Sequence, residues 1–143
     1  MEYVYGFGMA LSGPYEDVVL RVKEALKAEG FGVLTEIDVQ QTLSEKLGVQ
    51  MPPYLILDVC NPHLAHRALE LEPAIGLLLP CNVIVRTLGK ECSVEVADPN
   101  ALIDLSRNQQ LTPIAEEAKQ HLQRAIATLQ EDRSAGSACA PSP

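Results

Sequence analysis

The sequence predicts an α+β protein, namely a two-layer α/β sandwich with a mixed sheet of about five strands and a long C-terminal helix. In several short segments apolar residues alternate with period two, which is typical of half-buried strands. Between these segments, apolar residues recur every three to four positions, as they do in helices that cover a sheet. Gly and Pro separate the segments at positions typical of helix ends and turns.

Five segments are predicted to be strands, on the basis of alternation and of β-branched or aromatic content. They cover residues 2–11, 31–37, 54–60, 77–88 and 91–97. The last two are joined by Gly89 and Lys90, which predict a hairpin turn. Helical segments separate the earlier strands, and a parallel pair requires such a crossover, so these pairs are expected to be parallel and the sheet mixed.

Two helices have clear start and stop signals. The first opens at Pro14, where no backbone N–H is needed, and ends at Gly30, a residue that readily adopts the left-handed conformation of a helix C-terminus. The second is capped by Asn61, opened by Pro62 and ended by Pro73. Both are therefore placed between predicted strands.

The longest helix begins near Thr112 and presents a sustained apolar stripe, and shorter helical segments are expected at residues 39–47 and 98–105. The stripe consists of Ile114, Ala118, Leu122, Ala125, Ile126 and Leu129. Residues 133–143 have the composition of a flexible tail. Residues 1–132 are therefore predicted to form a single α/β domain.

Charge and length exclude several classes of function. The 143 residues carry a formal net charge of −8, which opposes binding to nucleic acid and to anionic membranes, because both need Lys and Arg at the contact. No apolar run is long enough to span a bilayer, and the N-terminus lacks the basic region of a signal peptide. We therefore expect a cytoplasmic protein whose four cysteines are reduced thiols, metal ligands or redox groups and not structural disulfides.

Cys60, Asn61 and Pro62 stand where a predicted strand passes into a predicted helix. A thiol at this position lies near the positive end of the helix dipole, which favours the thiolate, and the same turn is suited to a small anion. The plain alternative is that Cys60 is a small buried side chain and Asn61 only a cap. Asp58, two residues earlier, is either exposed at a sheet edge or paired, and the edge is the favoured interpretation.

A second Cys-Asn pair, Cys81-Asn82, follows Pro80 within the predicted strand 77–88. Cys81 shares the parity of the apolar residues of that strand and is expected to face the core, where packing alone would explain it. Pro80 lacks a backbone N–H, which favours an edge strand or a bulge. From parity we predict that Cys60 and Cys81 lie on neighbouring strands or at one end of the sheet.

Metal binding is a weaker interpretation of the same region. Cys60, His63 and His66 are spaced by three residues, and Cys81 could complete a tetrahedral site for a soft metal. However, apolar residues occupy the buried side of the predicted helix, so both histidines should face solvent, and no second ligand cluster supports the idea. No motif identifies a cofactor, and no stoichiometric zinc is expected.

Several motifs in the chain belong together. They are residues 29–39 (EGFGVLTEIDV), Leu43, Lys46-Leu47-Gly48, Tyr54, Cys60-Asn61-Pro62, Leu64-Ala65, Ala68-Leu69 and residues 76–81 (GLLLPC). From about Val4 to Leu129 the chain thereby resembles the family catalogued as domain of unknown function 302. The resemblance implies a compact α/β fold and a homodimer, and it implies no reaction. Both Cys60 and Cys81 fall within matching motifs.

Three functions are consistent with these residues. The favoured one is a binding or accessory module whose pocket near Cys60 and Cys81, with Asn61, Pro62 and Asn82, holds a small ligand or a soft metal. The second is a thiol-dependent redox enzyme that uses Cys60, with Cys81 as the resolving residue. The third is a structural dimer whose cysteines only pack. An enzyme is disfavoured because no histidine with a supporting carboxylate is placed beside either thiol.

Overall fold

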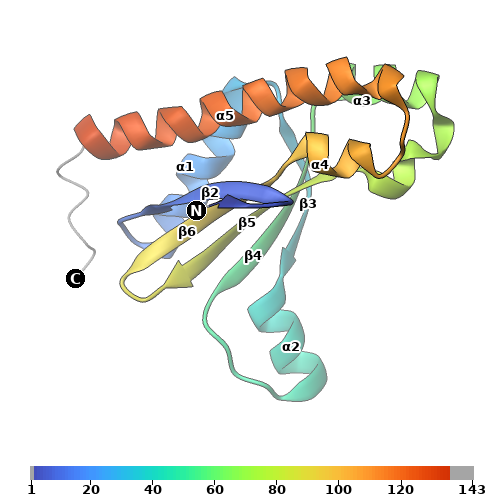
Figure 1. The fold of residues 1–143 in the computed structure, drawn as a ribbon. Coiled ribbons are helices and arrows are strands. Elements are labelled where there is room, and N and C mark those ends of the chain that lie inside the picture. Colours follow the sequence, from blue (N-terminus) through green and yellow to red (C-terminus); the bar gives the residue numbers. More distant parts are fainter. Residues whose placement is uncertain (1, 136–143) are drawn as a thin grey trace.

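Six strands form a single sheet in the computed structural model, which describes residues 2–135 (Figure 1). The strands are β1 (Glu2–Tyr3), β2 (Gly6–Leu11), β3 (Gly32–Asp38), β4 (Tyr54–Cys60), β5 (Cys81–Leu88) and β6 (Glu91–Ala97). Their order across the sheet is β1-β2-β6-β5-β4-β3. The predicted α+β class is confirmed, and the sixth strand arises because the first predicted strand, 2–11, is split by a turn at residues 4–5.

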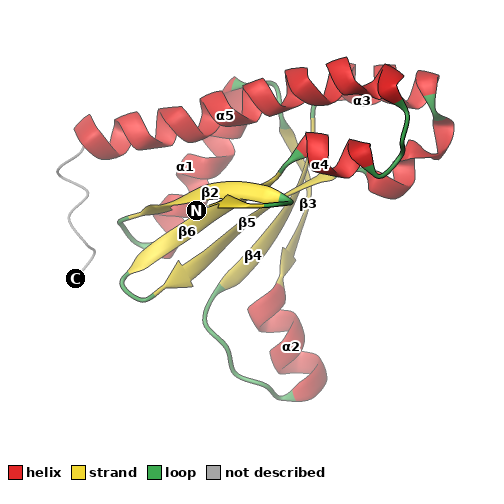
Figure 2. Cartoon of the chain, viewed as in Figure 1, coloured by secondary structure: helices red, strands yellow, loops and turns green. Residues whose placement is uncertain are grey.

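Helices connect β2 to β3, β3 to β4 and β4 to β5, and further helices follow β6 (Figure 2). They are α1 (Tyr15–Ala28), α2 (Val39–Leu47), α3 (Pro62–Leu71), the 3-10 helix η1 (Pro73–Leu78), α4 (Pro99–Asp104), the 3-10 helix η2 (Gln109–Leu111) and α5 (Thr112–Ala135). Helix α5 continues three residues into the predicted tail, and the remainder of that tail, with Cys139, lies outside the described residues. Within residues 2–135, no helix combines the length and the apolar composition of a membrane span.

The prediction of a mixed sheet is wrong, because all five strand pairs are antiparallel. Helix α2 and the α3–η1 segment each join strands that are antiparallel neighbours, so they serve as long hairpin connections. Helix α1 does lead to a strand of the same direction, but it crosses from β2 to β3, which three other strands separate. A helix between two strands in the sequence therefore did not make those strands a parallel pair.

Strand β5 begins at Cys81, directly after Pro80, and residues 73–78 form η1. The predicted strand 77–88 was thus too long at its start, since its first residues lie in or beside the 3-10 helix. Strand β5 pairs with β4 on one side and β6 on the other, so the edge or bulge expected at Pro80 is also wrong. Proline is accommodated just outside the strand, where no ladder hydrogen bond is lost.

The core lies on one face of the sheet. Along β4, Leu55, Leu57 and Val59 are buried while the residues between them keep partial exposure. Helices α1 and α5 pack against that face, and Val22 and Leu122 are among the side chains that they bury there. In Figure 1, α3, α4 and α5 lie above the sheet, whereas α2 projects beyond its lower end.

The opposite face holds a buried ion pair. The side chain of Glu95 is only 8% exposed, and Arg86 donates to both of its oxygens, at 2.8 and 3.3 Å. The hydroxyls of Ser93 and Tyr3 also donate to Glu95, at 2.9 and 3.1 Å. Burial alone would raise the pKa of Glu95, but these hydrogen bonds outweigh it and hold the pKa below the ordinary range.

We predict that Arg86→Ala destabilises the fold at neutral pH by about 2 kcal/mol, less than the roughly 3–5 kcal/mol of a fully buried pair, since Arg86 keeps 29% exposure. A lowered folded-state pKa means that the pair stabilises the protein above the ordinary glutamate value of about 4.3, and that this is lost as the pH falls through the folded-state pKa. Denaturant melts at pH 7 and pH 3 measure both effects.

The matched control is Arg67→Ala, which removes an exposed pair with Glu117 at 3.3 Å and should cost no more than about 1 kcal/mol. Equal losses for the two variants, or an Arg86→Ala loss that does not shrink at pH 3, would contradict this account of the pair.

Candidate functional site

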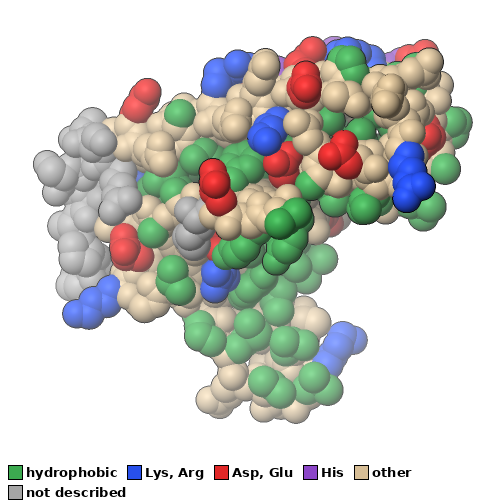
Figure 3. All heavy atoms as spheres, viewed as in Figure 1, with side chains coloured by type: hydrophobic (Ala, Val, Ile, Leu, Met, Phe, Trp, Pro, Cys, Tyr) green, Lys and Arg blue, Asp and Glu red, His purple; other side chains and the backbone are tan. Residues whose placement is uncertain are grey.

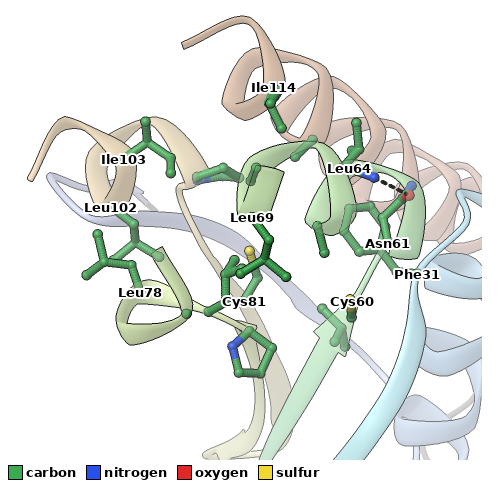
Figure 4. A pocket seen from close by; sticks show the side chains of 18 of the residues that line it. Phe31, Cys60, Asn61, Leu64, Leu69, Leu78, Cys81, Leu102, Ile103 and Ile114 are labelled. Carbon is green, nitrogen blue, oxygen red and sulfur yellow. Dashed lines mark hydrogen bonds between the residues drawn. The ribbon is translucent and has the colours of Figure 1, made fainter. Parts of the chain in front are cut away.

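A cavity of about 300 Å³ lies where the ends of β4 and β5 meet the helices (Figure 4). Its walls come from β4, β5, α3, η1, α4 and α5. The lining residues are Phe31, Leu34, Val59, Cys60, Asn61, Leu64, Ala65, Ala68, Leu69, Gly76, Leu78, Leu79, Pro80, Cys81, Pro99, Leu102, Ile103, Ile114 and Ala118. Small residues on facing helices, such as Ala68 and Ala118, leave space that larger side chains would fill.

Asn61 fixes the helix that forms one wall. Its Oδ1 accepts a hydrogen bond from the backbone N–H of Leu64 at 3.3 Å, and Pro62 occupies the first turn, so α3 begins as the sequence predicts. Gly30, at the end of α1, has a φ of +86°, and a Cβ there would lie 3.0 Å from Asn61 Nδ2. Gly30 and Asn61, 31 positions apart in the sequence, therefore lie against each other beside the cavity. Position 30 favours glycine because of its positive φ and because of the close approach of the Asn61 side chain.

The cavity wall carries no charge. None of the lining residues is Lys, Arg, His, Asp or Glu, and Asn61 provides the one side-chain amide. The Oδ1 of that amide already caps α3. An ionised group buried here would lose its hydration without gaining a partner, which is strongly unfavourable. The site is chemically suited to an uncharged, largely apolar molecule.

The two cysteines lie on neighbouring strands, as predicted. Cys81 is paired across the sheet with Val59, and Cys60 is the next residue of β4. Both line the cavity, both are partly buried and both are free thiols (Figure 4). Of the other predicted site residues, Asn61 lines the same cavity, whereas Pro62 and Asn82 do not line it and are exposed.

Both thiols are held in the protonated form at neutral pH. Burial raises the pKa of Cys60. Burial, and secondarily the nearby Cys60, raise the pKa of Cys81 to about 11. Burial in the apolar wall therefore disfavours the thiolate that was considered for Cys60 at the N-terminus of α3. The arrangement offers thiol groups as weak hydrogen-bond partners and lacks an activated nucleophile.

The structure does not assemble the weak metal candidates into a site. His63 and His66 are exposed on the outer side of α3, and His66 Nε2 lies 3.2 Å from Glu70 Oε1. Throughout residues 2–135, no group of three or more His, Cys, Asp and Glu side chains is arranged to hold a metal ion. The cavity therefore contains only the cysteine half of the predicted ligand set.

Asp58 does not lie on a sheet edge, which corrects the sequence interpretation. Strand β4 is interior, and the half-buried Asp58 accepts a hydrogen bond from Thr35 Oγ1 on β3 at 2.7 Å. The sequence interpretation also missed Phe31 and Ile103 as cavity residues. Their apolar character was visible, but their meeting at one sheet end depends on a strand order that no local pattern encodes.

Comparison with known proteins finds a matching family, a related protein and a related solved structure. The family model described as "Domain of unknown function DUF302" matches residues 7–129. An uncharacterized protein of Aquifex aeolicus (strain VF5) is 36% identical over 84 residues, which are 58% of this chain and 51% of that protein. The match therefore spans about half the length of this relative.

A solved structure agrees over more of the chain. It is the crystal structure of an uncharacterized conserved DUF302 protein from Bacillus stearothermophilus, which superposes with a TM-score of 0.81 at 29% identity. The superposition covers 87% of this chain and 98% of the other.

We predict slow alkylation of both cavity thiols below about pH 8.5, the ordinary thiol pKa. In a Cys139→Ala background, Cys60 should react slowly with iodoacetamide at pH 7.5, and Cys81 only near its pKa of about 11 or after unfolding. Raised pKa values leave little thiolate to react. Peptide mapping by mass spectrometry follows each site, and Cys60→Ala and Cys81→Ala assign the phases. A fast, Cys60-dependent phase below pH 7 would instead favour a thiol enzyme.

Proposed function

This chain belongs to the DUF302 family, and from that premise we propose that it is a binding module whose cavity holds a small, uncharged, largely apolar ligand. The single observation that carries the proposal is the cavity of about 300 Å³ with an entirely uncharged wall. Its volume lies at the lower end of the range of about 300–1,000 Å³ that is usual for ligand pockets.

Burial of apolar surface would supply the affinity. Transfer of such surface from water into the cavity contributes roughly 25 cal/mol for each Å² buried. The few polar groups, the Asn61 amide and the Cys60 and Cys81 thiols, would orient one weakly polar end of the ligand. A carboxylate or phosphate would find no cation there, so a charged head group would have to stay outside in water.

Access from solvent supports the same proposal. Leu34 and Leu69 line the cavity and keep 61% and 40% of their surfaces exposed, so the apolar wall continues to the protein surface. The cavity is therefore reachable by a ligand without unfolding of the core. Uncovered apolar side chains at a cavity mouth are typical of sites that take up apolar molecules.

The two other functions drawn from the sequence gain less support. A redox enzyme using Cys60 and Cys81 would need a readily formed thiolate, and burial disfavours that form for both residues. A purely structural module would gain from filling the cavity, because voids in a core destabilise it. A soft metal held by the two thiols alone would likewise have to overcome their raised pKa values.

A matched pair of fluorescent probes tests the proposal. N-phenyl-1-naphthylamine is uncharged, and 8-anilino-1-naphthalenesulfonate has the same ring system with an added sulfonate. We expect saturable binding of the uncharged probe, and at least tenfold weaker binding of the sulfonate because its charge finds no partner in the wall. Fluorescence titration measures both dissociation constants.

Variants place the probe in the cavity. Ala65→Phe fills space beside α3 and should weaken binding of the uncharged probe at least tenfold. Ala127→Phe, at an exposed position of α5, is the matched control and should leave binding unchanged. Equal binding of both probes, or binding unaffected by Ala65→Phe in protein with an unchanged circular dichroism spectrum, would contradict the proposal.

A further inference from the structure

A polar row crosses three strands directly beside the cavity. Thr35 of β3 is paired with Asp58 of β4, which is paired with Asn82 of β5. Alternation along β4 turns Asp58 away from the core face, where Leu57 and Val59 are buried. The row therefore lies on the sheet face that the helices leave uncovered, and it places a hydroxyl, a carboxylate and an amide next to one another.

The polar row adjoins the mouth of the cavity. Cys60 lines the cavity at the end of β4 (Figure 4), and it follows Asp58 by two residues on the same face of the strand. Two residues of a strand span roughly 7 Å. Leu34, whose exposed side chain belongs to the cavity mouth, directly precedes Thr35, at the point where the register of β3 on β4 shifts. A molecule that projects from the cavity can therefore reach the carboxylate of Asp58.

The Asp58 carboxylate has no cation of the chain as a partner. Its Oδ2 accepts a hydrogen bond from Thr35 Oγ1 at 2.7 Å, and across residues 2–135 no Lys, Arg or His forms an ion pair with it. On the side away from the cavity it borders the isoleucine row, which consists of Ile37, Ile56 and Ile84 paired across β3, β4 and β5. Beyond that row, Figure 3 shows hydrophobic side chains gathered over α2. The charge of Asp58 is therefore uncompensated between an apolar cavity and an apolar surface.

From these observations we infer that the ligand is an amphipathic amine, whose apolar part occupies the cavity and whose ammonium group lies outside it at Asp58. The inference rests on the proposed function, because the uncharged part of the amine is the part that the cavity holds. An ammonium group complements the charge of an unpaired carboxylate and also donates hydrogen bonds to it. The same carboxylate repels the head group of a fatty acid or an organic phosphate. Asp58 therefore selects among ligands whose apolar parts fit the cavity equally well.

Competition among three compounds with the same alkyl chain tests the inference. Octylamine, octanol and octanoate differ only in the head group, and each is titrated against N-phenyl-1-naphthylamine bound to the full chain at pH 7 and low salt. We expect octylamine to displace half of the probe at a concentration roughly fivefold lower than octanol, since only the ammonium gains a charge partner. Octanoate should be the weakest competitor, because its carboxylate is repelled by that of Asp58.

Variants assign the preference for the amine to Asp58. In protein with an unchanged circular dichroism spectrum, Asp58→Asn should make octylamine no more effective than octanol, because the charge is gone. Asn82→Lys is a second variant that keeps the carboxylate but places a cation of the chain beside it, so it should also abolish the preference. Asp17→Asn is the matched control, since it removes the same charge at an exposed position of α1 and should keep the preference.

The possible results separate this inference from the proposed function. If the probe binds and Ala65→Phe weakens its binding, but octylamine has no advantage over octanol, the binding module stands and the inference is overturned. An advantage that persists in both Asp58→Asn and Asn82→Lys also overturns it, as does an advantage that Asp17→Asn removes equally. A chain that does not bind the probe contradicts both the proposed function and the inference.

Discussion

The packing of α1 and α5 on only one face of the antiparallel sheet is the constraint on which the rest of the structure depends. It places the core between Val22 and Leu122 of the helices and the alternating buried residues of the central strands. The polypeptide must then connect β4 to β5 at the end of the sheet, and α3 and η1 do so by arching past the last strand residues. Val59, Cys60 and Cys81 at the ends of the strands line the space beneath that arch together with side chains of the helices, and they do not fill it.

The same constraint leaves the other sheet face without a helical cover from its own chain. Part of that face is closed by the Glu95–Arg86 pair with Ser93 and Tyr3, which buries polar atoms only because each hydrogen bond is made. The isoleucine row beside it has no such closure. The helix-covered side of the sheet therefore borders the unfilled cavity, and the other side keeps an uncovered apolar surface.

Local features of the fold could be predicted from the sequence, and long-range ones could not. The cap at Asn61 and the stop at Gly30 depend on residues within a few positions, so their chemistry identifies them. The antiparallel order of β2 to β6 is a choice among strands far apart in sequence, and the period-two pattern is the same for either direction. The placement of Cys60 and Cys81 on neighbouring strands was predicted from the sequence, whereas Phe31 and Ile103 joined the cavity wall only through the three-dimensional fold.

The central claim is that the arch of α3, η1 and α4 encloses an apolar space that the protein's own side chains do not fill. Apolar surface left in contact with water costs roughly 25 cal/mol for each Å² that could be covered, so an apolar space of about 300 Å³ should persist only where it serves a ligand. A crystal structure under xenon pressure tests this most directly, since xenon enters dry apolar cavities. The account predicts anomalous xenon peaks between Leu69, Ile103 and Cys81, and their loss in Ala65→Phe. A cavity closed by Leu69 and Leu78, with no xenon bound, would contradict it.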